Sequence, residues 1–544
     1  MNKLFYNIVK PIMAIAIFIL FSNTQKVFAQ NWNQILKTVA SDRGVGDNYG
    51  YSVAISGDYA IVGARDNTKD AAGGNILENA GSAYILKNNS GTWTEVQKIV
   101  ASDRGVNDWF GASVAISGDY AIISSYLDDE NATGGNTLTN SGSAYIFKNN
   151  SGTWSQVQKI VASDRSAFDF FGYSVAISGD FVIVGARGED HNTIGGDSIL
   201  NSGSAYIFKN NAGTWSQVQK LVASDRGAND WFGWSVAISG DYAIVGAYQE
   251  DHNLVGGNTI NDAGSVYMFK NNSGTWSQSQ KIVASDRGLD DWFGHSVAIS
   301  GDYAIIGASR EAHNVTGNDS LRRAGSAYIF KNNAGTWSQV QKIVSSDRGA
   351  HDEFGYSVAI FGDYAIVGAK FEDENTTGGN NLYNAGSAYI FKNNAGTWSQ
   401  IQKIVASDRG VEDWYGNAVA ISEEYAIVGA NYEDEPATGG NTLEDAGSIY
   451  IYKKGAPATG IVMNSFGNGL VVYPNPTNGN FSIDLGTVYV NIKISITDIS
   501  GKLIESIAVS ESQVLNLDIK EPSGTYIITI LSDNNKAVIK MIKK

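Results

Sequence analysis

Pairs of neighbouring acidic residues recur along the chain and could hold a cation. An Asn generally follows each pair, and a Gly-Gly comes after it. Carboxylate and amide oxygens on flexible loops are the ligands that a hard cation such as Ca²⁺ requires. A solvated acidic loop that keeps the protein in solution fits the same residues, so both interpretations stay open. The pairs are Asp128 with Asp129, Glu189 with Asp190, Glu250 with Asp251, Glu372 with Asp373, and Glu433 with Asp434.

A second set of residues could bind a ligand by stacking or by charge. Arg310 and His313 interrupt an otherwise acidic loop, where they could receive an anionic group or simply reflect drift in a solvated segment. Four Trp residues follow an Asp in a recurrent segment. If they are exposed, their rings could stack on sugars, and if they are buried they fill space between neighbouring elements. These are Trp109, Trp231, Trp292 and Trp414.

The sequence contains no arrangement typical of an enzyme. Catalysis needs unlike groups in unlike roles, and none of the five His lies in a recognisable nucleophile or metal motif. We therefore expect no catalytic residue and no enzymatic activity. Carboxylate pairs do suit sugar chemistry, so a glycosidase or polysaccharide lyase is the alternative to a binding protein.

These residues recur because the chain itself repeats every 61 residues. Each unit holds four strand-like runs, which in the second unit are 110–117, 120–123, 143–148 and 154–162. Four antiparallel strands at a fixed period predict one blade of a β-propeller. The string SVAISGDYAIVGA, or a close variant, begins at Ser52, Ser113, Ser174, Ser235, Ser296, Ser357 and Ala418.

The two ends of the repeat region predict a closed ring. The segment 32–40 matches the fourth strand of a unit, whereas the seventh unit stops after its third strand, 449–453. The N-terminal strand is therefore expected to complete the last blade. An open solenoid would need polar capping repeats instead. We expect an all-β fold, a seven-bladed β-propeller with four-stranded blades, followed by a small C-terminal β-sandwich.

Antiparallel strands bring the two long connections of each blade to one face, where binding residues tend to gather on loops. One connection carries the acidic pairs. The other reads Ser-Asp-Arg and supplies Asp225, Arg226 and Asp230 in the fourth unit. Its recurrence in all seven copies favours a structural role, in which Asp bonds the amides of its own turn and Arg reaches a carboxylate of the adjoining blade.

The N-terminus and the composition indicate export. Residues 1–29 read as a signal peptide, since Lys3 and Lys10 flank an apolar run too short to span a bilayer, and Val27-Phe28-Ala29 forms a small-residue cleavage site. We expect no transmembrane anchor in the mature protein. The formal net charge of −16 argues against nucleic acid as a partner.

The repeat resembles the bacterial FG-GAP repeats, which are related to the propeller of integrin α subunits. Phe171-Gly172 with Gly185-Ala186 carries this resemblance, which covers residues 30–455. It implies adhesion at a surface. The Asp-x-Asp-x-Asp-Gly calcium loop of integrin blades is absent, so calcium is not carried over. The Pro of the family motif is replaced in turn by Arg65, Tyr126, Arg187, Tyr248, Ser309, Lys370 and Asn431.

A different composition begins after the repeats. Residues 456–469 form a small-residue linker, and 470–544 show period-two apolar runs typical of a β-sandwich. The order of YPNP at 473–476, Asp498 with Gly501-Lys502, and Gly524-Thr525-Tyr526 resembles the C-terminal sorting domain of the type IX secretion system in Bacteroidetes. The resemblance implies passage across the outer membrane, removal of this domain, and release or attachment to the surface. An ordinary binding module fits the same strands.

The sequence thus predicts a secreted or cell-surface propeller that binds or adheres to an extracellular glycan or protein through its acidic, loop-rich face. A glycan-active enzyme and a passive surface scaffold remain alternatives. Ca²⁺ is the only cofactor that the residues suggest, and the secretion machinery is the partner expected for the C-terminal domain.

Overall fold

The computed structural model describes residues 31–544 except 136, 255, 258, 318, 319, 380, 438–440, 456–460, 467–469, 474–476, 499, 500, 534 and 544. The expected signal peptide, much of the expected linker and most of the YPNP motif lie outside the described residues. Residues 31–455 and the residues from 456 onward form two separate compact units.

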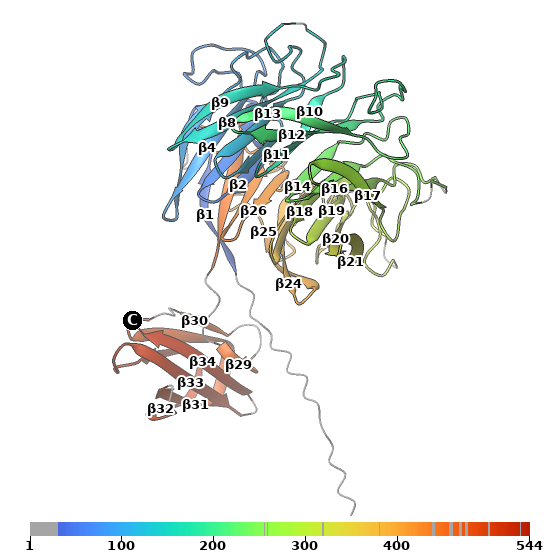
Figure 1. Ribbon diagram of the computed structural model, residues 1–544. Coiled ribbons are helices and arrows are strands. Elements are labelled where there is room, and N and C mark those ends of the chain that lie inside the picture. The colour runs from blue at the N-terminus through green and yellow to red at the C-terminus, as the bar shows by residue number, and fades with distance from the viewer. Residues whose placement is uncertain are drawn as a thin grey trace, which may run out of the picture. The chain divides into compact units, whose positions relative to one another are not determined.

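The first unit contains seven antiparallel sheets of four strands each, which confirms the predicted propeller (Figure 1). Within each sheet the strands follow chain order. The first three sheets are β2 (Tyr49–Ser56), β3 (Tyr59–Ala64), β4 (Ser82–Asn89) and β5 (Thr92–Ile99); β6 (Val114–Ser117), β7 (Tyr120–Ser125), β8 (Ser143–Asn150) and β9 (Thr153–Ile160); and β10 (Phe171–Ser178), β11 (Phe181–Ala186), β12 (Ser204–Asn211) and β13 (Thr214–Leu221).

The next three sheets repeat this arrangement. They are β14 (Ser235–Ser239), β15 (Tyr242–Ala247), β16 (Ser265–Asn272) and β17 (Thr275–Ile282); β18 (Phe293–Ser300), β19 (Tyr303–Ala308), β20 (Ser326–Asn333) and β21 (Thr336–Ile343); and β22 (Ser357–Phe361), β23 (Tyr364–Ala369), β24 (Ser387–Asn394) and β25 (Thr397–Ile404). We call the seven sheets blades 1 to 7 in this order.

Blade 7 is built from both ends of the repeat region, as the sequence predicts. It contains β26 (Ala418–Ile421), β27 (Tyr425–Ala430) and β28 (Ser448–Lys454), and its fourth strand is β1 (Trp32–Thr38). β1 runs antiparallel to β28, with Trp32 opposite Lys454 and Thr38 opposite Ile449. Figure 1 shows the blue N-terminal strand beside the orange end of the repeat region. Pairing of the chain ends removes two open sheet edges.

Close approach of the backbones between blades explains the Phe-Gly and Gly-Ala motifs. A Cβ atom on Gly246 of blade 4 would overlap the carbonyl oxygen of Gly294 in blade 5. The hydroxyl of Ser235 donates a hydrogen bond of 2.7 Å to the same oxygen. The two glycines therefore let neighbouring blades meet near the central axis, where the first strands of the blades surround it.

The outer strands are joined by a second recurrent contact. The side-chain amide of Gln158 accepts a hydrogen bond from the backbone N–H of Trp215 at 2.9 Å and donates one to its carbonyl oxygen at 2.6 Å. The Trp ring itself is buried between the blades, as expected for these fourth-strand residues. The same pairing links Gln97 to Trp154, Gln219 to Trp276, Gln280 to Trp337, Gln341 to Trp398, and Gln402 to Trp32.

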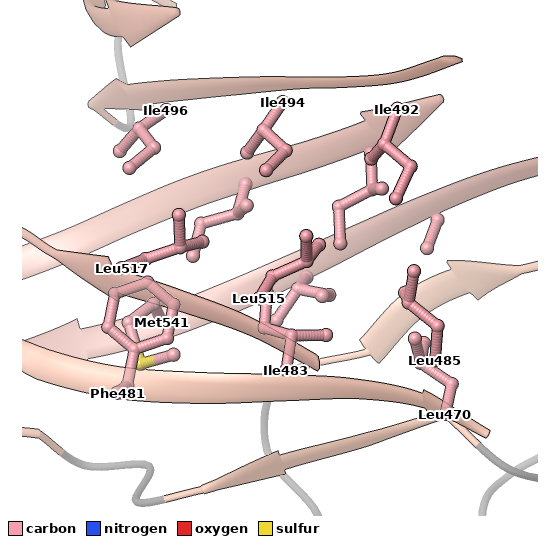
Figure 2. Packing of buried hydrophobic residues seen from close by; sticks show 14 of the residues in the cluster. Leu470, Phe481, Ile483, Leu485, Ile492, Ile494, Ile496, Leu515, Leu517 and Met541 are labelled. Atoms are coloured by element: carbon pink, nitrogen blue, oxygen red, sulfur yellow. The ribbon is translucent and has the colours of Figure 1, made fainter. Parts of the chain in front are cut away.

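The C-terminal unit is a six-stranded sheet folded around one apolar core. Its strands are β29 (Ile461–Asn464), β30 (Val471–Tyr473), β31 (Asn480–Asp498), β32 (Leu503–Asp518), β33 (Gly524–Ser532) and β34 (Asn535–Lys543). The long strand β31 changes register after Asp484, so its first half pairs with β30 and its second half with β33. Side chains from both halves, such as Ile483 and Ile494, point into the same core (Figure 2).

Among the residues that the structure describes, no helix is long and apolar enough to cross a membrane.

Candidate functional site

The two long connections of neighbouring blades are bonded to each other on the loop face. The backbone N–H of Trp231, in the connection that enters blade 4, donates to the carbonyl oxygen of Asn201 at the end of the acidic loop of blade 3. The next residue, Phe232, forms a parallel bridge with Gly203. The same contacts join Trp109 to Asn79 and Phe110 to Gly81. The acidic loops and the Asp-Trp segments therefore form one continuous surface around the propeller axis.

The first carboxylate of each acidic pair is buried and bonded within the protein. In blade 3, Glu189 is fully buried and lies 2.6 Å from the ammonium of Lys220, which also contacts Asp164 at 2.7 Å. The hydroxyl of Ser204 donates to Glu189 at 2.7 Å. Equivalent ion pairs join Asp128 to Lys159, Glu250 to Lys281, Glu372 to Lys403 and Glu433 to Lys37. A lysine ammonium thus supplies the positive charge at each of these carboxylates.

The second carboxylate of each pair fixes the end of its own loop. Asp190 accepts the backbone N–H of Asn201 at 2.7 Å, and four further Asp residues accept the equivalent amide. They are Asp129, Asp251, Asp373 and Asp434. These bonds hold the loop in one conformation and favour the structural interpretation of the pairs over the calcium interpretation, which stays a prediction.

Two blades gather a third carboxylate at this position. Asp347, Glu372 and Glu374 in one cluster have carboxylate oxygens within 4.8 Å of one another, as do Asp413, Glu433 and Glu435 in the other. Each cluster also contains a lysine: Lys403 lies 2.6 Å from Asp347, and Lys37 lies 3.3 Å from Glu433. Among the residues that the structure describes, these oxygens are thus the ones best spaced for a cation, and each cluster already holds an ammonium group.

The Ser-Asp-Arg connection has the expected structural role but uses different acceptors. The carboxylate of Asp230 accepts the N–H of Gly227 in its own turn at 2.6 Å, as predicted. The guanidinium of Arg226 instead donates to the backbone carbonyl oxygens of Asp190 and Asp197 and to the hydroxyl of Ser202. The expectation that Arg226 reaches a carboxylate is wrong. The side chain of Asp190 is bonded within its own loop, so its backbone carbonyl oxygen is the group that faces the guanidinium.

Burial at these turns changes the acidity of the second Asp of the connection. Removal from water raises the pKa of Asp230 to about 7, and the nearby charge of Glu250 adds to this effect. The same cause raises the pKa of Asp169 to about 8. Burial likewise raises the pKa to about 7 for Asp108, Asp291, Asp352 and Asp413. Because these groups occupy equivalent places in six blades, we assign them to the scaffold and not to catalysis.

Three repeat positions converge around the central axis on the loop face, and we call their side chains the axial ring. They are the residue before Phe-Gly, the residue after Phe-Gly, and the residue after Gly-Ala. In some blades Tyr replaces the Phe of the first motif, or Ser replaces the residues of the second. The third position is where the family motif has Pro. In blade 3 these are Phe170, Tyr173 and Arg187, and in blade 4 they are Trp231, Trp234 and Tyr248.

Cations of the axial ring lie on aromatic faces. The guanidinium carbon of Arg187 lies 4.5 Å from the ring centre of Tyr173 and 4.6 Å from that of Trp231 in the next blade. That of Arg65 lies 3.9 Å from Tyr51 and 4.3 Å from Trp109. Each side chain therefore joins the ring of its own blade to the ring of the next, and cation–π attraction stabilises the arrangement.

A continuous aromatic cluster extends from blade 3 to blade 6. Tyr173 contacts Trp234 at 4.5 Å between ring centres, and Trp234 contacts His295 at 5.7 Å. His295 in turn lies 4.9 Å from Tyr356. Burial, with the charge of Lys370, lowers the pKa of His295 to about 3, so its imidazole is neutral at pH 7.

Lys370 extends the ring through blade 6. Its ammonium lies 3.5 Å from the ring centre of Tyr356 and 4.4 Å from that of Trp414. Burial lowers its pKa to about 7, and the neighbouring Glu353 opposes this shift. Between blades 7 and 1 the pattern changes to amides, since Asn431 donates to Asn48 at 2.7 Å.

The structure places all four predicted Trp residues in the axial ring, each half-buried. Trp231 lies against Arg187, whereas Trp292 carries the guanidinium of Arg310 at 3.2 Å from its ring centre. The predicted His313 has another position: its Nδ1 lies 3.1 Å from Glu311 in its own acidic loop. These Trp residues are therefore packed against neighbouring side chains and remain partly exposed.

Sequence reasoning did not propose Tyr51, Arg65, Tyr173, Arg187 or Lys370 as site residues. The available signal is variation within the repeat. The string SVAIS hardly changes from unit to unit, whereas the residue after Phe-Gly does change. In the first and last units the motif itself is Tyr-Gly. The residues that follow it are, in turn, Tyr51, Ala112, Tyr173, Trp234, His295, Tyr356 and Asn417.

Comparison with known proteins agrees with this architecture. A family model described as the FG-GAP repeat matches seven times, at residues 32–86, 93–147, 154–208, 215–269, 276–330, 337–391 and 398–452. A model described as a secretion system C-terminal sorting domain matches residues 471–544. No curated protein matches the chain.

Proposed function

The chain belongs to the FG-GAP repeat family and ends in a type IX secretion sorting domain, and from this we propose that it is an exported binding protein whose ligand docks on the axial ring. The sorting domain implies interaction with the type IX secretion machinery and export to the cell surface or beyond. Within this coarser assignment, the ligand, a glycan or a protein, belongs to the proposal.

One observation carries the proposal: the repeated units keep the same first strand but differ in the side chains that meet at the axis. Six of the seven units keep Ser-Val-Ala-Ile in the first strand, whereas the axial ring combines Trp, Tyr, Arg, Lys and His. A structural requirement common to all blades would select one residue type at each position. A site for a particular ligand needs unlike groups at defined places, on a rigid scaffold and at the meeting point of loops.

The contacts of the carboxylates support a binding role over an enzymatic one. Glycoside hydrolysis needs two carboxyl groups at a set distance, with lone pairs directed at the substrate. Here Glu189 is bonded to Lys220 and Ser204, and Asp190 to a backbone amide. The repeated acidic pairs are therefore engaged in holding loops, and the proposal contains no catalytic residue.

Screening the purified protein on arrays of glycans and matrix proteins, with and without EDTA, tests this function. Retention of a glycan or a protein is the expected result. Conversion of a glycan into shorter products would replace the proposal with the enzyme alternative, and no retention on either array would favour the passive scaffold. Loss of retention in EDTA would add calcium dependence to the binding role.

A further inference from the structure

The axial ring and the neighbouring Arg310 hold partly or fully buried positive charge, which Asp66, Asp290 and the ring's own Glu353 offset only in part. Arg65 has a partner, because its Nε lies 3.2 Å from Asp66. Arg310 has a distant one, since its Nη1 lies 3.9 Å from Asp290. In the described part of the chain, Arg187 and Lys370 form no ion pair with any carboxylate.

Arg187 is the clearest case. Four aromatic rings surround its guanidinium, those of Phe170, Tyr173, Trp231 and Trp234, at 4.5 to 5.4 Å from the guanidinium carbon. Its Nε atom is buried and has no hydrogen-bond acceptor among the described residues. A guanidinium that stacks on aromatic rings directs its N–H groups outward in its own plane. A carboxylate or sulfate that lies in this plane can accept two of them.

Neighbouring groups of the ring share this excess of donors. The Nε atom of Arg310 is buried without an acceptor in the described residues. The ammonium of Lys370 is buried against Tyr356, Phe371 and Trp414. Buried polar groups are costly when unpaired, so an acceptor that enters the ring gains interaction energy there that solvent-exposed cations would not provide.

The surroundings of the ring select the kind of acceptor. The protein as a whole carries a formal net charge of −16, and the acidic loops lie on the same face as the ring. A polyanion that spreads over this face meets repulsion from the loops. A compact ligand with one acidic group and apolar faces meets mainly cations and aromatic rings at the axis, where Glu353 is the one carboxylate among the axial-ring positions.

We infer that the axial ring binds a sugar that carries a carboxylate or sulfate group, with the anion at Arg187 and Lys370 and the sugar ring on the half-buried faces of Trp231 and Trp234. This inference rests on the proposed function and names the class of ligand. Both anionic groups offer the same chemistry, namely planar or tetrahedral oxygens that accept from a guanidinium and an ammonium.

Calorimetric titration of the full-length protein tests the inference. The probes are galacturonate, its methyl ester, a monosulfated disaccharide and a glutamate-rich hexapeptide. We expect at least one acidic sugar to bind at least about tenfold more tightly than the neutral ester, because the ester lacks the charge that forms the charge-assisted hydrogen bonds. The two acidic sugars tell a carboxylate from a sulfate.

Matched variants locate the effect. Arg187→Gln should remove the preference for the acidic sugar, whereas Lys209→Gln should change it less than about twofold. Lys209→Gln removes the same charge at the Gly-Asp turn end of blade 3, where the ammonium lies over the ring of Phe181. Lys370→Met is the second site variant, in case Arg187→Gln does not fold, and should weaken acidic sugars alone.

Three results would overturn the inference. Equal affinity for the ester and the acids would show that a glycan binds without an anion contact, which leaves the proposed function intact. Binding of the peptide but not of the sugars would assign the ring to a protein ligand. Failure of all four probes, with no retention on the glycan and protein arrays, would end both the inference and the proposed function.

Discussion

The side-chain amide of Gln402 accepts a hydrogen bond from the backbone N–H of Trp32 at 2.7 Å and donates one to its carbonyl oxygen at 2.9 Å, across 370 residues of sequence. This pairing ties blade 6 to the N-terminal strand in blade 7. At the next junction, between blades 7 and 1, the equivalent position is Leu36, which packs against a cluster that includes Trp93. The ring is therefore closed by polar pairing on one side of β1 and by apolar packing on the other.

Ring closure predicts that the N-terminal strand is essential for stability. Deletion of residues 30–41 should lower the urea midpoint sharply, because it exposes the edge of β28 and the apolar surface beneath Trp32. The single change Trp32→Ala should cost about 3–5 kcal/mol. The control Ile35→Ala lies in the same strand at a residue 40% exposed and should cost less than about 1 kcal/mol. A deletion variant that unfolds like the parent would refute the closure.

Close approach of the glycine backbones gives a second prediction. Gly246→Ala should destabilise the protein by about 1–3 kcal/mol, since the new methyl group meets the carbonyl oxygen of Gly294. Gly257→Ala is the control in a loop of the same blade, where a Cβ atom meets nothing within 4 Å. Chemical unfolding measures both variants, and equal stability of the two would count against this explanation of the Gly-Ala motif.

The buried Asp230 makes stability depend on pH. Its pKa is about 7 in the folded protein and about 3.9 in an unfolded chain. Between these values the folded state holds a proton that the unfolded state has lost, so this group reduces stability as the pH rises from about 4 to about 7. Asp230→Asn removes that titration and keeps an acceptor for Gly227.

Thermal unfolding at about pH 5 and about pH 8 checks the sign. The melting temperature of Asp230→Asn relative to the parent should be higher at the alkaline pH than at the acidic one. A difference that is the same at both pH values would show that burial does not raise the pKa of this carboxyl.

The lysine ion pairs predict a weak response to calcium. A cation that enters the loop of blade 3 must displace Lys220 from Glu189, so millimolar Ca²⁺ should shift the melting temperature by less than about 1 °C. Lys220→Met should cost about 3–5 kcal/mol, because it leaves Glu189 buried and unpaired. A clear rise in melting temperature with Ca²⁺, reversed by EDTA, would instead favour the calcium interpretation of the acidic pairs.

The sequence predicts the blades well because each blade is a local unit. The strands, the Gly-Asp turn and the acidic loop of one blade lie within a single 61-residue period, and β1 could be assigned to blade 7 because its pattern matches the strand that blade 7 lacks. The register change that lets β31 pair with β30 in its first half and with β33 in its second depends on tertiary packing and has no such local pattern.

The site is less accessible to sequence reasoning because its contacts join residues that are distant in the chain, and some of these contacts cross between blades. Lys159 is 31 residues from Asp128 in the chain, and nothing in the loop itself reveals the ammonium that pairs with the carboxylate. Arg187 contacts Trp231 and Trp234 of the next blade. Such neighbours can be recognised only when the blade is known to turn the residues after Phe-Gly and Gly-Ala toward the axis.

The affinity of Trp234→Ala for the ligand retained on the arrays tests the central claim most directly. Trp234 lies half-buried in the axial ring, whereas Phe361, 45% exposed, lies at the Gly-Asp turn on the opposite face, where all six other blades have Ser. We predict that Trp234→Ala weakens binding at least about tenfold, and that Phe361→Ser leaves the affinity unchanged. Unchanged affinity of a folded Trp234→Ala variant, or an equal loss in Phe361→Ser, would contradict binding at the axial ring.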